Sequence, residues 1–126
     1  MSSERISLGQ QGEQLAAALL RKEGYRILEC NYRGRLGEID LIAEEEGCLV
    51  FVEVKTRRNL ACGHPLESID RRKQRQLIKV AREYLAEKGE EERFCRFDAV
   101  SVLQCTGQPP RVELVKDAFE LAGDGF

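Results

Sequence analysis

Apolar and polar residues recur along the chain with two different periods. Over residues 10–24 and 65–88 the apolar positions return every three to four residues, which predicts two amphipathic helices, the second beginning at Pro65. Elsewhere the period is two, the pattern of strands, with glycine or proline at the predicted turns. The predicted elements are a helix over 10–24, strands over 25–33, 37–45 and 48–56, a helix over 65–88, and strands over 93–103 and 111–117.

The order of these elements, α-β-β-β-α-β-β, predicts an α/β fold in which a mixed central sheet is flanked by helices. A chain of 126 residues fits one domain that is large enough to bury a core. We therefore expect a single domain over residues 1–126, with loose termini at 1–8 and 118–126.

The hairpin over the second and third strands carries charges where its alternation calls for core residues. A two-residue turn at Glu46-Gly47 would pair Asp40 with Glu53 and Glu38 with Lys55 across the strands. Alternation then places these four side chains on one face of the hairpin. The opposite face would hold Ile39, Leu41, Ala43, Val50, Val52 and Val54.

Each predicted helix carries one further charged residue on the stripe that is expected to face the core. Glu13 lies on the same stripe as Leu20, and Lys73 lies between Ile69 and Leu77 on the apolar stripe of the second helix. Each has an ordinary explanation: Glu13 as a first-turn acid facing the helix dipole, and Lys73 as a lysine whose stem covers the edge of the core.

Paired carboxylates of this kind are the ligands with which a metal-dependent phosphodiesterase binds its metal ion. Facing carboxylates repel each other, and burial adds a desolvation cost that a cation would offset. Mg²⁺ or Mn²⁺ held by Asp40 and Glu53 would keep positions open for phosphate oxygens, with Glu13 as an additional acid and Lys55 assisting the attacking water. Glu38 would support the site from the same face. The residues alone leave open the alternative of a non-catalytic core stabilised by salt bridges.

The distribution of charge points to one basic face. The net charge is −2, but residues 53–82 hold nine Lys or Arg against three Asp or Glu, a local charge of +6, and the rest of the chain carries −8. Such a face suits a polyanion, although a basic helix can also be merely solvated. The predicted contacts to nucleic-acid phosphates are Lys73, Arg57, Arg58, Arg72 and Arg75.

The remaining composition bears on location. The five cysteines are odd in number and form no C-x-x-C, which predicts free thiols in a reducing compartment. Residues 1–14 lack the apolar segment of a signal peptide, and no stretch approaches the ~20 apolar residues of a membrane span. We expect a cytoplasmic protein with no membrane partner.

Five segments resemble, in the same order, the sequence pattern of the bacterial YraN family. They are GEQLAAALLRKEGYRILECNYR, GEIDLIA, LVFVEVKTR, GHPLESIDRRKQRQL and RFDAV. The resemblance extends over roughly residues 9–102, and it links the chain to the archaeal Holliday junction resolvases and the PD-(D/E)xK nuclease superfamily. It implies a restriction-endonuclease-like fold.

The resemblance also implies roles for the charged residues. Asp40 and Glu53 match the metal-binding acids, Lys55 matches the catalytic lysine, and Glu13 matches the additional acid on the first helix of resolvase-like members. Ile39 stands where the superfamily has its eponymous proline, a position that many members relax.

The RFDAV segment places another acid, Asp98, inside a predicted strand. Because no other metal-ligand residue lies beside it in the sequence, we expect a structural role, such as an ion pair with Arg96.

Residues and resemblance together predict a Mg²⁺- or Mn²⁺-dependent endonuclease. Its expected substrate is DNA in preference to RNA, with branched or recombination-linked DNA implied by the resemblance, as is a homodimer. The alternative is a non-catalytic nucleic-acid-binding module that has a nuclease-like fold and acts through a partner that processes DNA.

Overall fold

The computed structural model describes residues 7–58 and 69–119. Its elements follow the predicted order. They are α1 (Leu8–Lys22), β1 (Arg26–Arg33), β2 (Glu38–Glu45), β3 (Cys48–Arg57), α2 (Arg71–Lys88), β4 (Cys95–Leu103) and β5 (Arg111–Phe119).

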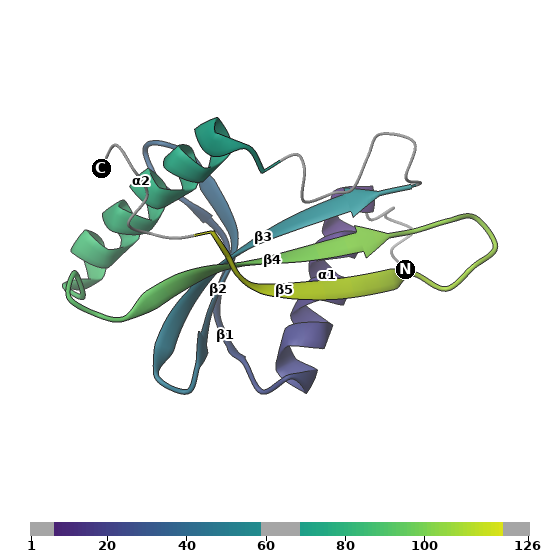
Figure 1. The fold of residues 1–126 in the computed structure, drawn as a ribbon, viewed down its shortest axis with the longest axis horizontal. Coiled ribbons are helices and arrows are strands. Elements are labelled where there is room, and N and C mark those ends of the chain that lie inside the picture. Colours follow the sequence, from purple (N-terminus) through teal and green to yellow (C-terminus); the bar gives the residue numbers. More distant parts are fainter. Residues whose placement is uncertain (1–6, 59–68, 120–126) are drawn as a thin grey trace, which may run out of the picture.

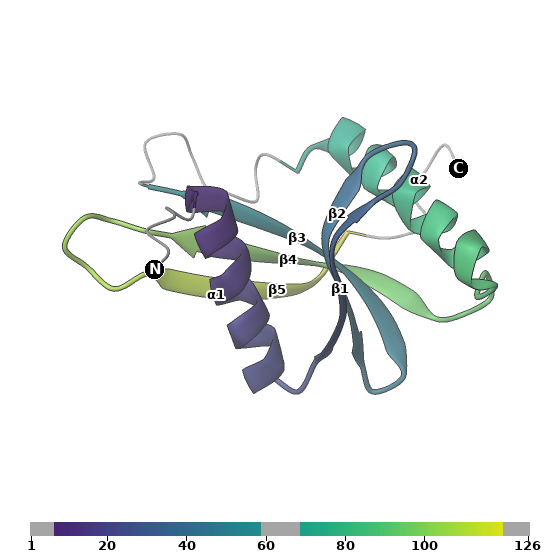
Figure 2. The same cartoon turned by 180° about the vertical axis from the view of Figure 1, so that it is seen from behind.

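The strands form one mixed sheet in the order β1-β2-β3-β4-β5. Among the described strands only β3 and β4 pair in parallel, and α2 provides the crossover that a parallel pair requires. The two helices lie on opposite faces of the sheet: α2 is in front in Figure 1, and α1 is in front in Figure 2. The predicted α/β class, a mixed sheet flanked by helices in the order α-β-β-β-α-β-β, is confirmed.

Each face of the sheet has its own apolar core, so the central strands are covered on both sides, as expected of strands with apolar residues on both faces. The core beneath α2 contains Phe51, Leu77 and Tyr84, and the core beneath α1 contains Leu20 and Val52. Charged groups on the central strands therefore lie next to packed side chains rather than on an open surface.

The first helix begins two residues before its predicted start. Ser7 caps it: its hydroxyl accepts from the backbone N–H of Gln10, whose side chain accepts in return from Ser7 N. This capping box satisfies two backbone donors that a helix start would otherwise leave unpaired. The helix ends near its predicted stop, where Gly24 takes a left-handed conformation with φ of 96°.

The prediction of one continuous helix over 65–88 was wrong at its start. Pro65 itself lies outside the described residues, but Asp70 is extended, with ψ of −179°, and the helix begins at Arg71. The Asp70 side chain caps it by accepting from Lys73 N at 2.9 Å. Ile69, predicted within the helix, precedes it and is nonetheless buried. The Asp70 cap thus sets the start of the helix at Arg71, although the apolar stripe extends to residues before it.

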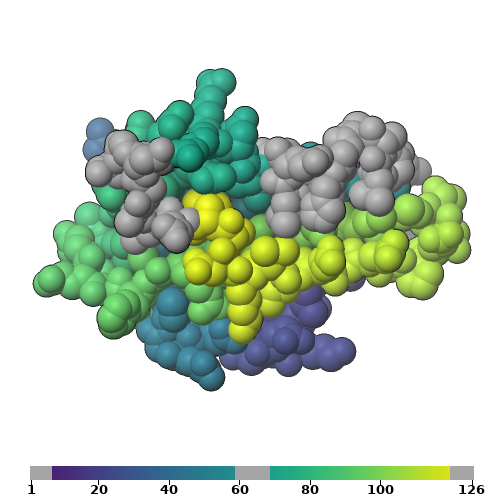
Figure 3. Space-filling model, in the orientation of Figure 1, coloured from purple at the N-terminus to yellow at the C-terminus, as the bar shows by residue number. Residues whose placement is uncertain are grey.

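The last strand continues through Ala118 and Phe119, which the sequence had placed in a loose tail. The reason is packing, because the ring of Phe119 stacks on that of Phe97 at a centroid distance of 4.6 Å. In the space-filling view β5 (yellow) crosses the face of the molecule below α2 (teal) (Figure 3). The predicted thiols at Cys30, Cys48, Cys95 and Cys105 are unbridged. No helix in the described segments is long and apolar enough to cross a membrane.

Candidate active site

The β2–β3 hairpin has the predicted register, but its backbone ladder stops where the acid pair begins. The Cα pairs run from Glu45 and Cys48 to Leu41 and Val52. One residue further, the carboxylate of Asp40 accepts a hydrogen bond of 2.8 Å from the backbone N–H of Val54. The side chain of Asp40 thus satisfies a β3 donor that the ladder no longer uses, and this fixes the carboxylate beside β3.

A bend in β1 accompanies this change. Asn31 has a left-handed backbone, with φ of 54°, and lies between the pairs Cys30–Leu41 and Tyr32–Ile39, which places it opposite Asp40. The alternation is interrupted there. Ile39 consequently packs with Tyr32 in the core beneath α2, whereas the sequence had placed it on the other face with Leu41. The prediction for Ile39 was wrong because it assumed that side chains alternate strictly through Asp40, where the strand is irregular.

The carboxylates meet as predicted at the open end of the hairpin. Burial, and after it the negative charge of the neighbouring Glu53, raise the pKa of Asp40 to about 7. The charge of Glu13 acts in the same direction, while the bond from Val54 opposes it. Asp40 is therefore held where its ionised form is costly without a nearby cation.

A close helix–strand contact brings Glu13 to this end of the sheet. A Cβ atom on the neighbouring Gly12 would lie only 2.0 Å from Thr56 Oγ1 of β3, so only glycine permits α1 to approach so closely. Glu13 itself is half-buried. The inward direction of Glu13 follows from the helical stripe, whereas the role of Gly12 in setting its depth was not predicted.

Two lysines form ion pairs with Glu53, whose side chain is 6% exposed. Lys55 Nζ lies 3.3 Å and Lys73 Nζ 3.4 Å from the same oxygen, Glu53 Oε2. Lys55 shares β3 with the acid, and Lys73 reaches it from the first turn of α2. The inward direction predicted for Lys73 holds, but its ammonium here contacts an acid of the candidate site.

The other predicted residues lie outside this cluster. Glu38, expected to face Lys55, forms an ion pair of 2.9 Å with Arg33 on β1. Arg57 Nη1 donates to the neighbouring Thr56 carbonyl. Arg58 lines a pocket of about 440 Å³ between the start of α1 and the β4–β5 loop. The remaining two arginines, Arg72 and Arg75, are exposed near the start of α2.

The donor set suits a hard divalent cation with water in its coordination shell. Within residues 7–58 and 69–119, no three His, Cys, Asp or Glu side chains are close enough to hold a metal ion among them. Asp40 and Glu53 offer carboxylate oxygens from two adjacent strands, and Mg²⁺ is usually bound through one or two carboxylates plus waters. The residues thus fit Mg²⁺ or Mn²⁺ bound by this pair, and the charge of Glu13 acts on Asp40 without making Glu13 a third ligand already in place.

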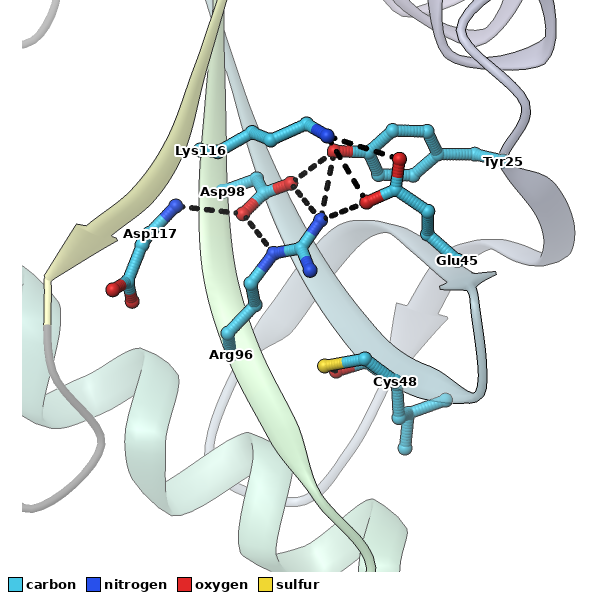
Figure 4. A network of polar contacts seen from close by, with 8 residues as sticks. Tyr25, Glu45, Cys48, Arg96, Asp98, Lys116 and Asp117 are labelled. Carbon is cyan, nitrogen blue, oxygen red and sulfur yellow. Dashed lines mark hydrogen bonds and ion pairs between the residues drawn. The ribbon is translucent and has the colours of Figure 1, made fainter.

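A second polar cluster, shown in Figure 4, lies on the α1 side of the sheet and holds the other buried acid. Asp98 is fully buried and accepts from Tyr25 Oη at 2.6 Å and from Arg96 Nε at 2.9 Å. The predicted pairing of Asp98 with Arg96 is confirmed. The same carboxylate also accepts from the backbone N–H of Asp117, which has a left-handed backbone.

This cluster joins four segments of the chain. Arg96 Nη2 contacts Glu45 at 2.6 Å, and Lys116 Nζ contacts the same carboxylate at 3.0 Å. Every hydrogen-bonding position of Asp98 is thus matched by a donor, which is typical of a structural buried acid. Sequence reasoning missed Tyr25, Glu45 and Lys116, because only the tertiary fold brings them beside Asp98.

Comparison with known proteins places the chain among bacterial relatives. A model of the family described as "Uncharacterised protein family UPF0102" matches residues 12–102. A UPF0102 protein of Geotalea uraniireducens is 49% identical over 120 residues, which is 95% of this chain and 94% of the relative. One of Rhodococcus jostii is 44% identical over 117 residues, covering 93% of this chain and 99% of the relative.

Among solved structures, one titled "Structure of EndoMS-dsDNA2 complex" is similar, with a TM-score of 0.42 and 20% sequence identity. The match covers 85% of this chain and 41% of that chain.

Proposed function

This chain belongs to the UPF0102 family, and we propose that it is a metal-dependent endonuclease that hydrolyses phosphodiester bonds of DNA. The observation that carries the proposal is the end of the β2–β3 hairpin, where Val54 N–H holds the Asp40 carboxylate at 2.8 Å beside the charge of Glu53, and Lys55 Nζ lies 3.3 Å from Glu53. Two acids and a lysine on adjacent strands supply a cation site and a neighbouring positive charge, the groups that phosphodiester hydrolysis needs.

The electrostatic cost of placing Asp40 beside Glu53 favours a functional role for this pair over a purely structural one. Asp98, buried more deeply, is matched by donors from three sides. Asp40 instead faces other acids, and its pKa is raised. A purely structural core would gain stability from apolar residues at these positions, whereas perturbed carboxylates in proximity are characteristic of functional sites.

In the proposed site, Asp40 and Glu53 would hold Mg²⁺ or Mn²⁺, and Glu13 would contribute a further acid. The ion, when bound, would polarise the phosphoryl group and lower the pKa of a bound water. Val54 N–H holds the Asp40 carboxylate in place throughout. Lys55, whose side chain is 20% exposed, orients the attacking water or neutralises charge that develops on the phosphate.

The proposed substrate contacts come from both ends of the segment between β3 and α2. Arg57 is the last residue of β3 and Arg58 follows it, while Arg72 and Arg75 lie with Lys73 near the start of α2. Contacts of this type bind backbone phosphates and position a strand without reading its sequence. We propose DNA rather than RNA, with branched DNA as the preferred form and a homodimer as the unit that cuts both strands.

A cleavage assay tests the proposal on linear, flapped and four-way-junction DNA, with a matching RNA, in Mg²⁺ or Mn²⁺. Asp40→Ala, Glu53→Gln and Lys55→Ala should each lower the rate by about 10²-fold or more, the size expected for loss of electrostatic stabilisation in the transition state. Lys79→Ala, an exposed lysine on α2, is the control and should cleave normally. Cleavage that survives in Asp40→Ala or Lys55→Ala would place the active site elsewhere.

A further inference from the structure

Lys73 differs from Lys55 in where it comes from. Lys55 reaches Glu53 Oε2 from two residues further along the same strand, whereas Lys73 reaches that oxygen from α2. Lys73 therefore makes the only ion pair between α2 and this acid among the described residues. Its side chain is 33% exposed, against 20% for Lys55, so it has more room to move.

The backbone that carries Lys73 is held firmly. Asp70 accepts from Lys73 N at 2.9 Å, and Gln74 Nε2 donates to the carbonyl of buried Ile69 at 3.0 Å. The first turn of α2 is thus fixed to the core from both sides of Lys73. Only the flexible side chain needs to move for the ammonium to leave Glu53.

Two ammonium groups on one carboxylate oxygen conflict with a divalent ion on that carboxylate. A cation bound by Glu53 and Asp40 would repel both lysines at a few ångströms, and at least one would have to leave. Lys55 is confined on the strand beside the acid, so Lys73 is the group that can withdraw toward solvent. Once withdrawn, its ammonium would be available to bind a phosphate of a substrate that approaches the site.

We propose that Lys73 is an exchangeable counter-ion of Glu53, which holds the acid when no metal is bound and moves to a substrate phosphate when a divalent ion takes its place. The proposal rests on the metal site proposed above. It makes Lys73 a positioning residue that couples metal binding to DNA binding, because each favours the released lysine.

Calorimetric titration with Mn²⁺, without DNA, tests the exchange. Removing the competing ammonium in Lys73→Met should tighten Mn²⁺ binding about five- to tenfold, within the usual range of coupling between sites. Lys73→Arg keeps the charge and should bind Mn²⁺ as the wild type does, and Lys79→Met on the exposed face of α2 is the matched control. Equal affinity in the wild type and Lys73→Met would overturn the exchange while leaving the metal site intact. If the wild type binds no Mn²⁺, the metal site itself fails.

A second measurement needs no variant. Acylation of lysines in the wild-type protein, followed by mass spectrometry, reports how available each ammonium is. Saturating Mg²⁺ should raise the acylation rate of Lys73 severalfold relative to Lys79, because the ammonium leaves the Glu53 carboxylate. An unchanged ratio at saturating Mg²⁺ would contradict the proposal.

Discussion

The backbone N–H of Val54 donates to the carboxylate of Asp40 across 2.8 Å, one residue beyond the point where the β2–β3 backbone ladder ends. This hydrogen bond holds the Asp40 carboxylate beside Glu53, where its ionised form is unfavourable, instead of letting it turn to solvent. The candidate site thus lies where the regular backbone pairing of β2 and β3 ends. Asn31 of β1, whose backbone is left-handed, lies opposite Asp40 at the same level.

Neutralising Asp40 should stabilise the protein while abolishing its activity. Asp40→Asn keeps an oxygen for Val54 N–H and removes the repulsion from Glu53, so without metal at pH 8 its free energy of unfolding should rise by about 1–3 kcal/mol. Asp40→Ala leaves that N–H without its acceptor and should be less stable than Asp40→Asn by about 1–2 kcal/mol. Urea unfolding measures both. An Asp40→Asn protein less stable than the wild type would show that the carboxylate is structural.

The raised pKa of Asp40 gives stability a definite pH dependence. The folded state keeps a proton on Asp40 up to pH about 7, while the unfolded chain releases it near its ordinary 3.8. The Asp40 contribution to stability should therefore fall as pH rises between these values and stay level above them. The difference between wild type and Asp40→Asn across pH 4–8 isolates this contribution. A difference independent of pH would contradict the shift.

The affinity for Mn²⁺ should change with pH in the opposite direction. A proton on Asp40 competes with the ion, so binding should strengthen as pH rises and level off above about 7. Titration calorimetry at several pH values measures this. Affinity that is constant between pH 5 and 8 would show that Asp40 is not a ligand.

Gly12 should tolerate no side chain. Gly12→Ala forces α1 away from Thr56, which we expect to cost about 1–3 kcal/mol and to lower cleavage by displacing Glu13. Gly9→Ala is the control on the same helix, since an added Cβ there meets nothing within 4 Å. Thermal unfolding and the cleavage assay report both effects. Equal behaviour of the two variants would rule out Gly12 as the residue that sets the depth of α1.

The Asp98 cluster should behave as structure rather than site. Asp98→Ala leaves Arg96 and Asp117 N–H without their buried acceptor, so we expect a loss of about 3–5 kcal/mol. Tyr25→Phe removes one hydrogen bond and should cost about 1 kcal/mol. Folded Tyr25→Phe should bind Mn²⁺ like the wild type. A Tyr25→Phe protein that is fully folded but binds no Mn²⁺ would make the cluster part of the site.

Local patterns were enough to predict the order of elements, the hairpin register and the inward direction of Lys73. These features follow from alternation, turn residues and helical periodicity, which are written in short stretches of sequence. The alternation also brought Asp40 and Glu53 together, because a two-residue turn at Glu46-Gly47 fixes which residues face each other.

What could not be predicted depends on irregular backbone or on distant partners. Ile39 packs in the core beneath α2, whereas Leu41 packs beneath α1, and nothing in the alternation signals this change of face at Asp40. Glu38 faces Arg33 because β1, rather than β3, supplies its neighbour. The Ser7 and Gln10 capping box and the Asp70 cap were missed, although the sequence displays the residues of both.

Crystals soaked in Mn²⁺ test the central claim most directly, through the anomalous scattering of the metal. The account predicts one peak between the carboxylates of Asp40 and Glu53, with Lys73 Nζ withdrawn from Glu53, and no such peak in Glu53→Gln. At saturating Mn²⁺, the absence of density between these carboxylates, or its persistence in Glu53→Gln, would contradict the account.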